Sequence, residues 1–367
     1  MPPTPSMATL KNDYHHHQTN KLSNKFKVCV MDASGSLGSS LVNTLLQRGY
    51  FVHAAIQSHF QDIEDIVLDE DTLHMVAVGE ADYRWWCDDN VCGLGGNGGG
   101  GKGCIGWCLK ILHADLLDYH SILDTLSGCS ALFYSFEPPL EHPVYDEHMT
   151  EIEVRAAHNV LEACAQTPTM EKVIFTSSAT AVVWTDTRND SSLSCDADEK
   201  SWSDISFCKK FKLWHAMSKT LAEKTAWALA MDRGMSMVSI NGGLLLDNSS
   251  NNLLNTSTTN NKQKTSNLPP YLKGAAEMYE NGVLVAVDLK FLVDAHVCVF
   301  EEMASYGRYV CFNHVINCHK DAVKIAAMFI SSPPQSLEDP REYPQRISNK
   351  KLNKLMVNFD GRFKLHS

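Results

Sequence analysis

The sequence contains no long uninterrupted apolar run and no excess of positive charge. Without such a run, we expect no membrane-spanning helix. Basic residues number 32 against 43 acidic ones, and the formal net charge is -11. Proteins that bind nucleic acid through many phosphate contacts carry a basic face, so we expect no nucleic-acid partner. Residues 1–24 lack the apolar core of a signal peptide, which predicts a disordered tail and a cytoplasmic protein.

Cysteine, in contrast, is abundant, with 12 residues scattered through apparent strands and helices. A reducing compartment explains this scatter, with each thiol acting as a small buried hydrophobic group. Four cysteines flank a glycine-rich stretch, namely Cys87, Cys92, Cys104 and Cys108. A structural zinc site needs closely paired ligands, and only the second pair approaches that spacing. We therefore favour free thiols and expect no metal.

Short apolar runs of strand length alternate with segments of helical periodicity along the chain. Strands are predicted at Lys27–Met31, Phe51–Gln57, Leu109–Ala114, Ala131–Ser135, Lys172–Ser177 and Met235–Asn241. Helices are predicted at Leu37–Gln47 and Ser121–Leu126, and along the apolar faces that run from Val154 to Cys164 and from Met217 to Leu229. Strict alternation predicts an α/β fold with a doubly wound parallel Rossmann sheet.

Composition divides the chain further. After the tail, residues 25–247 are expected to form a Rossmann domain with a glycine-rich insertion at 93–103. Residues 248–267 are rich in Asn, Ser, Thr and Lys, which predicts a mobile loop. Residues 268–367 show a more mixed pattern. We expect them to form a smaller C-terminal substrate lobe that closes over the carboxyl edge of the sheet.

The segment Val28–Gly38 joins the first predicted strand to the first helix. Its glycines permit a tight turn, and the main-chain N–H groups at a helix N-terminus suit a diphosphate. We therefore expect a dinucleotide to contact the run from Asp32 through Ser34, Gly35, Ser36 and Leu37 to Gly38. An ordinary strand–helix turn in a fold that binds no nucleotide is the alternative.

Asp32 stands where the usual pattern has its first glycine. A carboxylate at about 4 Å from a phosphate costs roughly 4 kcal/mol at an effective dielectric constant near 20. Asp32 is therefore expected either to point away from the phosphates or to weaken cofactor binding.

Farther along, three runs carry a specific family pattern: Val173–Ser178, Asp198–Asp204 and Lys212–Lys219. They resemble the plant cinnamoyl-CoA and dihydroflavonol reductases, which are extended short-chain dehydrogenases, and look most like a divergent cinnamoyl-CoA reductase-like branch. The resemblance extends from about Lys27 to Phe359. It implies a reductase that uses NADP, with NAD not excluded, and a phenolic or CoA-thioester substrate. It also implies a role in phenylpropanoid or plant-defence metabolism.

The same resemblance assigns candidate site residues. Ser178 matches the serine that hydrogen-bonds the substrate carbonyl, and Lys219 matches the lysine that holds the nicotinamide ribose. Asn159 matches an asparagine that supports this network. Asp115, followed by Leu116, matches a residue at the adenine. Gln57 stands where an arginine usually recognises the 2'-phosphate, so neither NADP nor NAD is selected at this position.

The family's catalytic tyrosine is replaced by His215, four residues before Lys219. An imidazole can act as a general acid, although the ring reaches less far than a phenol. The nearby lysine favours the neutral ring, which still carries one N–H. The alternative is a packed histidine that shapes the pocket. Phe136 also departs from the family, which has a small residue there.

Two functions therefore remain open from the sequence. The first is an NAD(P)H-dependent reductase of an aromatic thioester, ketone or aldehyde, in which Ser178, His215, Lys219 and Asn159 form the catalytic group. The second is a catalytically impaired NAD(P)-binding protein with a regulatory role. The oligomeric state is left open.

Overall fold

The expected alternation of strands and helices is present in the computed structural model, which describes residues 26–57, 109–138, 144–185, 196–247, 268–329 and 340–363. A seven-stranded parallel sheet has the order β3-β2-β1-β4-β5-β6-β9. Its strands are β1 (Lys27–Met31), β2 (Phe51–Gln57), β3 (Leu109–Ala114), β4 (Ala131–Tyr134), β5 (Lys172–Ser178), β6 (Met237–Gly242) and β9 (Gly307–Cys311). The predicted doubly wound fold is therefore confirmed.

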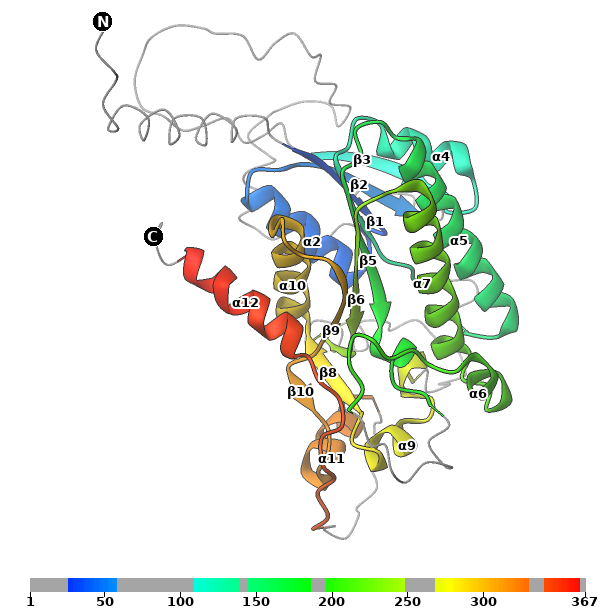
Figure 1. Cartoon of the computed structure of the whole chain (residues 1–367), viewed down its shortest axis with the longest axis vertical. Coiled ribbons are helices and arrows are strands. Elements are labelled where there is room, and N and C mark those ends of the chain that lie inside the picture. The colour runs from blue at the N-terminus through cyan, green and yellow to red at the C-terminus, as the bar shows by residue number, and fades with distance from the viewer. Residues whose placement is uncertain are drawn as a thin grey trace, which may run out of the picture.

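Helices cover both faces of this sheet (Figure 1). One face carries α2 (Ser36–Gln47), α10 (Leu289–Glu301) and α12 (Lys350–Phe363), and the other carries α4 (Tyr119–Leu126), α5 (Glu147–Gln166) and α7 (Trp214–Arg233). Side chains of a strand alternate between its faces. In β1, Val28 and Val30 accordingly pack with α2 and α10, whereas Cys29 and Met31 pack with α4 and α5. Buried apolar residues on both sides explain the almost continuous apolar strands.

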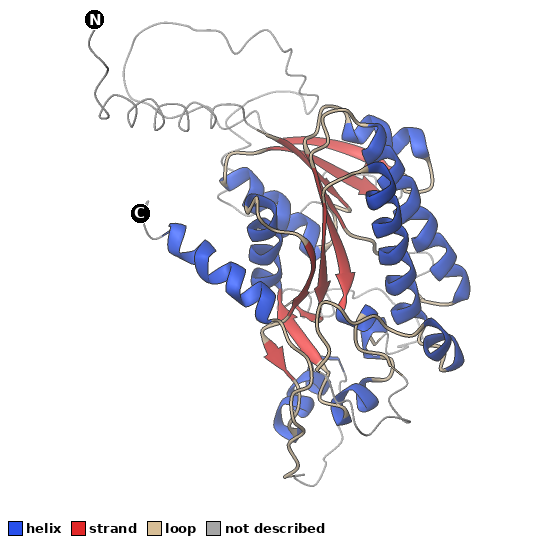
Figure 2. Cartoon of the chain, in the orientation of Figure 1, coloured by secondary structure: helices blue, strands red, loops and turns tan. Residues whose placement is uncertain are grey.

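A smaller lobe lies beyond the carboxyl edge of the sheet, below it in Figure 2. It contains a three-stranded sheet with the order β10-β8-β7. Its elements include β7 (Leu244–Leu246), β8 (Val285–Asp288), β10 (His314–Val315), α6 (Ile205–Lys210), α9 (Ala275–Glu280), α11 (His319–Phe329) and the short 3-10 helices η3 (Ala179–Ala181) and η5 (Pro270–Leu272). Its apolar cluster joins residues that follow β5, such as Trp184, to Val285 and Phe312.

The lobe is not a separate C-terminal domain. The segment 268–367 also supplies β9, which pairs with β6 as the seventh strand of the main sheet. The same segment supplies α10, which packs against α2. The boundary expected at residue 268 is therefore corrected: apolar strands and helices late in the chain return to the Rossmann core, because that core is where their apolar faces can be buried.

Several sequence expectations lie outside the described residues: the tail, the insertion at 93–103 with its four flanking cysteines, and the loop 248–267. Within the described ranges, no helix is both long and apolar enough to cross a bilayer. The same ranges hold no group of three His, Cys, Asp or Glu side chains arranged to ligate a metal ion.

Candidate active site

The sheet order reverses between β1 and β4, so the segments that follow these two strands diverge at the carboxyl edge, where doubly wound sheets have their ligand crevice. Ligands of doubly wound sheets bind at such a switch point. The turn after β1 leads into α2, whose N-cap residue, Gly35, provides no side-chain cap. A Cβ placed on Gly38 would lie 2.0 Å from the main-chain oxygen of Asp32. Only glycine therefore permits this close contact between helix and turn.

Asp32 itself takes a left-handed backbone conformation with φ of 68°. Aspartate tolerates this region better than most residues, as does glycine, which occupies the position in the usual pattern. The side chain is buried, its Oδ1 lies 3.5 Å from the Ser34 hydroxyl, and its Oδ2 has no hydrogen-bond partner. Burial, reinforced by the nearby Glu137 carboxyl, raises the pKa of Asp32 to about 8.

Glu137, three residues after β4, reaches across the crevice to the same turn. A Cβ built on Gly35 would lie 3.0 Å from Glu137 Oε1, so the carboxyl group of Glu137 lies against the start of α2. Desolvation of the carboxyl group by the surrounding protein raises the pKa of Glu137, although the residue as a whole is exposed and the positive charge of Lys219 opposes the shift. The Gln57 side chain, at the end of β2, donates to the Glu137 carbonyl over 3.3 Å. Two carboxyl groups thus border the expected diphosphate position.

Lys219 projects from α7 between this turn and the end of β5. Its Nζ lies 2.7 Å from Glu153 Oε1 and donates to the carbonyl of Phe136 over 3.0 Å. The other carboxylate oxygen of Glu153 accepts a hydrogen bond from Ser218. An ammonium group carries three protons, so these two contacts leave one proton for a ribose hydroxyl. The position fits the role that the resemblance implies for Lys219.

Ser178, at the end of β5, and His215, in the first turn of α7, are joined through Thr180. The Thr180 hydroxyl lies 3.0 Å from Ser178 Oγ and 3.1 Å from His215 Nδ1. The Tyr145 ring meets the His215 ring edge-on, with 4.9 Å between centroids, and Lys219 Nζ lies 5.9 Å from the Tyr145 centroid. Burial, with the Lys219 charge adding to it, lowers the pKa of His215 to about 3. The ring is therefore neutral at physiological pH.

A buried ion pair holds the end of β5 in place. Arg308 Nε on β9 lies 2.8 Å from Glu223 Oε1 on α7, and the guanidinium also stacks on the Trp202 ring at 3.6 Å. Glu223 accepts hydrogen bonds from Ser177, Ser239 and Asn241. Asn241 also donates to the Ser178 carbonyl over 3.3 Å. This network fixes the backbone at Ser178, because a buried carboxylate whose oxygens are all hydrogen-bonded has one favoured arrangement.

Not every predicted residue joins this group. Asn159 donates its amide to the carbonyls of Leu116 and Leu117, over 3.2 and 3.4 Å. It follows Glu153 by six residues, which is about 9 Å along a helix and a different face of it. Asn159 therefore supports the loop after β3, where Asp115 is exposed, and Glu153 is the α5 residue that contacts Lys219. The contacts described for Asn159 are with this loop, and its expected place in the catalytic group stays a prediction.

Sequence reasoning missed four polar residues of the site: Glu137, Tyr145, Glu153 and Thr180. One signal was available, because Glu153 lies four residues after Met149 on the buried face of α5, where a lone carboxylate needs a partner. Thr180 could also have been proposed, because it is a polar residue only two positions after Ser178. Nothing in the sequence marks Glu137 or Tyr145.

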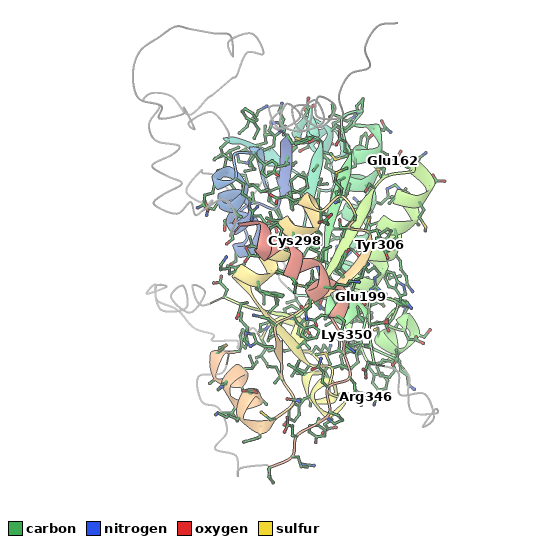
Figure 3. All side chains as sticks on the ribbon, turned by 60° about the vertical axis from the view of Figure 1, so that its left-hand side comes forward. Glu162, Glu199, Cys298, Tyr306, Arg346 and Lys350 are labelled. Carbon is green, nitrogen blue, oxygen red and sulfur yellow. The ribbon has the colours of Figure 1, made fainter. Side chains whose placement is uncertain are left out.

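A separate surface cavity of about 650 Å³ lies at the start of α12, beside Lys350 (labelled in Figure 3). Its lining includes Asp196, Phe291, Phe312 and Asn349, and none of the predicted site residues. The candidate active site therefore lies at the crevice between β1 and β4 rather than at this cavity.

No family model matches the chain. Cinnamoyl-CoA reductase 1 of Petunia hybrida is 30% identical over 90% of this chain and 87% of its own length. Tetraketide alpha-pyrone reductase 1 of Arabidopsis thaliana is 28% identical over 92% of this chain and 88% of its own length. The chain belongs to the cinnamoyl-CoA reductase family.

Solved structures support the same fold for this family member. Vestitone reductase from alfalfa, Medicago sativa, superposes with a TM-score of 0.57 at 21% identity, over 90% of this chain and 91% of that one. A yeast methylglyoxal/isovaleraldehyde reductase, solved as a complex with NADPH, gives a TM-score of 0.58 at 15% identity, over 90% and 93%. The expected Rossmann fold and family resemblance are both confirmed.

The residues at the crevice fit a dinucleotide under one condition. The uncapped N-terminus of α2 offers main-chain N–H groups to a diphosphate, and Gly35 leaves room for it. Lys219 keeps one proton for a ribose. The Glu137 carboxyl group lies against that same room. Since like charges repel, it has to swing away or carry a proton when a diphosphate enters.

Proposed function

We propose that this family member is an NADPH-dependent reductase of an aromatic thioester, ketone or aldehyde, and that it acts in phenylpropanoid or defence metabolism in the cytoplasm. The observation that carries the proposal is the meeting of Ser178, His215 and Lys219 at the edge of the dinucleotide crevice. Ser178 and His215 share the Thr180 hydroxyl, and Lys219 lies next to the same aromatic ring as His215. Substrate names of the relatives support the aromatic class.

Each residue has a chemical task in this proposal. The dinucleotide, when bound, supplies hydride to the substrate carbonyl carbon. Ser178 holds the carbonyl oxygen, and Lys219 holds the ribose with its remaining proton. Aromatic rings of Tyr145 and Tyr271 flank His215, with centroids at 4.9 and 6.3 Å from it, and they suit a flat phenolic substrate. NADPH is favoured because the yeast reductase of this fold binds it, and Gln57 carries no charge that would exclude the 2'-phosphate.

The test is turnover by purified protein with NADPH, or with NADH, and feruloyl-CoA or coniferaldehyde. We expect slow oxidation of the nicotinamide, because loss of the family's tyrosine removes a proton donor worth about two to four powers of ten in rate. His215→Tyr is expected to accelerate it. Lys219→Met is the control: it removes the ammonium group proposed to hold the ribose and should abolish binding of the dinucleotide. Absence of turnover in both the wild type and His215→Tyr would contradict the proposal for these substrates.

A regulatory NAD(P)-binding protein is the second candidate, favoured by the neutral His215 ring and by the Glu137 carboxyl group that lies in the crevice. Calorimetric titration with NADPH and NADH distinguishes the two functions. Tight binding without turnover favours regulation, and binding with turnover favours the reductase.

A further inference from the structure

The Thr180 side chain occupies the gap between His215 and Ser178. It projects from η3, directly after β5, and is 2% exposed. Its hydroxyl is within hydrogen-bond distance of both neighbours, at 3.0 Å from Ser178 Oγ and 3.1 Å from His215 Nδ1. An imidazole at position 215 reaches less far than the phenol of the family, and a buried hydroxyl fills the missing distance.

The number of protons on each group fixes which atom donates in the hydrogen bonds that join His215, Thr180 and Ser178. Ser178 Oγ accepts from the Thr180 main-chain N–H at 3.2 Å and from the Thr180 hydroxyl at 3.0 Å. The proton of Ser178 itself therefore remains available to a substrate carbonyl. Thr180 has one hydroxyl proton, and it is donated to Ser178 Oγ in this hydrogen bond. Its contact with His215 then requires a proton on Nδ1, which leaves Nε2 as the bare nitrogen of the neutral ring.

Nearby groups keep the ring neutral in this arrangement. The positive charge of Lys219 faces it from α7, the Tyr145 and Tyr271 rings pack against it, and burial disfavours a second cation. A neutral imidazole gives no net proton by itself. It can pass one on, however, when Nε2 gains a proton while Nδ1 releases another. The surrounding side chains remove enough water from the ring to lower the pKa of His215, yet part of the residue stays exposed to solvent.

We propose that Thr180 is a positioning residue that relays a proton from His215 to Ser178 during carbonyl reduction. The inference rests on the proposed reductase function. As hydride adds to the carbonyl carbon, the Ser178 O–H bond breaks and the substrate O–H bond forms. Ser178 regains a proton from Thr180, and Thr180 regains one from His215 Nδ1. A solvent proton binds Nε2 as Nδ1 releases its proton, so the ring stays neutral, and exchange with solvent returns a proton to Nδ1 before the next turnover. The sum is one hydride from the dinucleotide and one proton from solvent.

The test compares two substitutions at one position. Thr180→Val keeps the shape of the side chain but removes the hydroxyl, and we expect kcat to fall about 100-fold, with KM and the NADPH dissociation constant unchanged. Thr180→Ser retains the hydroxyl and should stay within about threefold of the wild type. A normal solvent deuterium isotope effect on kcat is expected in the wild type, because several O–H and N–H bonds change together. If Thr180→Val fails to fold, Thr180→Ala removes the same hydroxyl without adding atoms.

A second background separates relay from packing. In His215→Tyr a phenol delivers its own proton, so adding Thr180→Val should cost less than about threefold in kcat. The nitrogen NMR spectrum of the wild-type imidazole should show a proton on Nδ1. Equal kcat for the wild type and Thr180→Val, an equal loss in both backgrounds, or a proton on Nε2 alone would overturn the relay. Lack of turnover in the wild type would instead overturn the proposed function, and the relay with it.

Discussion

Dinucleotide affinity should depend on pH through Asp32. Burial raises the pKa of this carboxyl to about 8, with the Glu137 charge as the second cause and the Ser34 hydroxyl and Lys219 opposing. At pH 7 the group is therefore mostly protonated and neutral, and its O–H can donate to a phosphate oxygen. The repulsion expected from the sequence applies only to the ionised form. At about 4 Å and an effective dielectric constant near 20, that repulsion reaches roughly 4 kcal/mol.

The magnitude follows from proton linkage. Above pH 8, binding has to take up one proton, so the dissociation constant for NADPH should rise about tenfold per pH unit, or about 1.4 kcal/mol. Between pH 7 and pH 9 we expect about a tenfold loss of affinity in total. The repulsion of roughly 4 kcal/mol limits the loss to about three powers of ten. Calorimetry in two buffers of different ionisation enthalpy measures both the affinity and the proton uptake.

Asp32→Asn is the matched control, because the amide has the same shape, does not ionise and tolerates the positive φ. Its affinity should be flat from pH 6.5 to about 9.5, a range that leaves lysine charged. Glu137→Gln removes the neighbouring charge, so the loss of affinity should begin below pH 8. A wild-type affinity that stays flat across this range, or an Asp32→Asn variant that follows the wild-type curve, would refute the reasoning.

Other consequences concern stability. Folded Asp32 keeps its proton to about pH 8, whereas the unfolded chain loses it near pH 4, so the folded state binds more protons between these values. Thermal melts should therefore show stability falling as pH rises through that window and levelling above it. Asp32→Asn should lack this decline. Glu223→Gln leaves Arg308 buried without its partner and should cost about 3–5 kcal/mol in urea unfolding. The partly exposed pair of Arg233 and Glu162, which is labelled in Figure 3, provides the comparison: Glu162→Gln should cost less than about 1 kcal/mol, and an equal loss for both glutamates would contradict the assignment. Gly38→Ala places a methyl group 2.0 Å from the Asp32 carbonyl, and should lower the melting temperature and weaken NADPH binding together; a variant with unchanged binding would argue against a role for this turn.

The fold was predictable because it depends on local patterns. The apolar runs at 27–31 and 51–57 coincide with β1 and β2, since strands buried on both faces are recognisable as apolar runs. The run at 109–114 coincides with β3, an edge strand whose residues are mostly only partly buried or exposed. Gly35 and Gly38 also indicated the turn, because a close backbone contact there requires glycine and is therefore visible in the sequence. The fate of segment 268–367 was harder to predict, because a strand's partner is chosen by the whole sheet rather than by the strand.

The site was only partly predictable. Ser178, His215 and Lys219 were identified by the family pattern and lie together in the structure. Asn159 had the right residue type on the right helix, but the helix turns it toward the loop after β3. The charge state of Asp32 was also beyond the sequence, because it depends on burial and on a carboxyl group more than a hundred positions away.

By itself, the sequence determined the order of strands and helices, the dinucleotide turn, the family and the replacement of tyrosine by histidine. Only the tertiary structure decided which polar groups meet: Glu137 at Gly35, Glu153 at Lys219, and Thr180 between Ser178 and His215. The physical reason is one of range. Backbone conformation responds to neighbours in sequence, whereas hydrogen bonds and charge states depend on separations of a few ångströms that only packing sets.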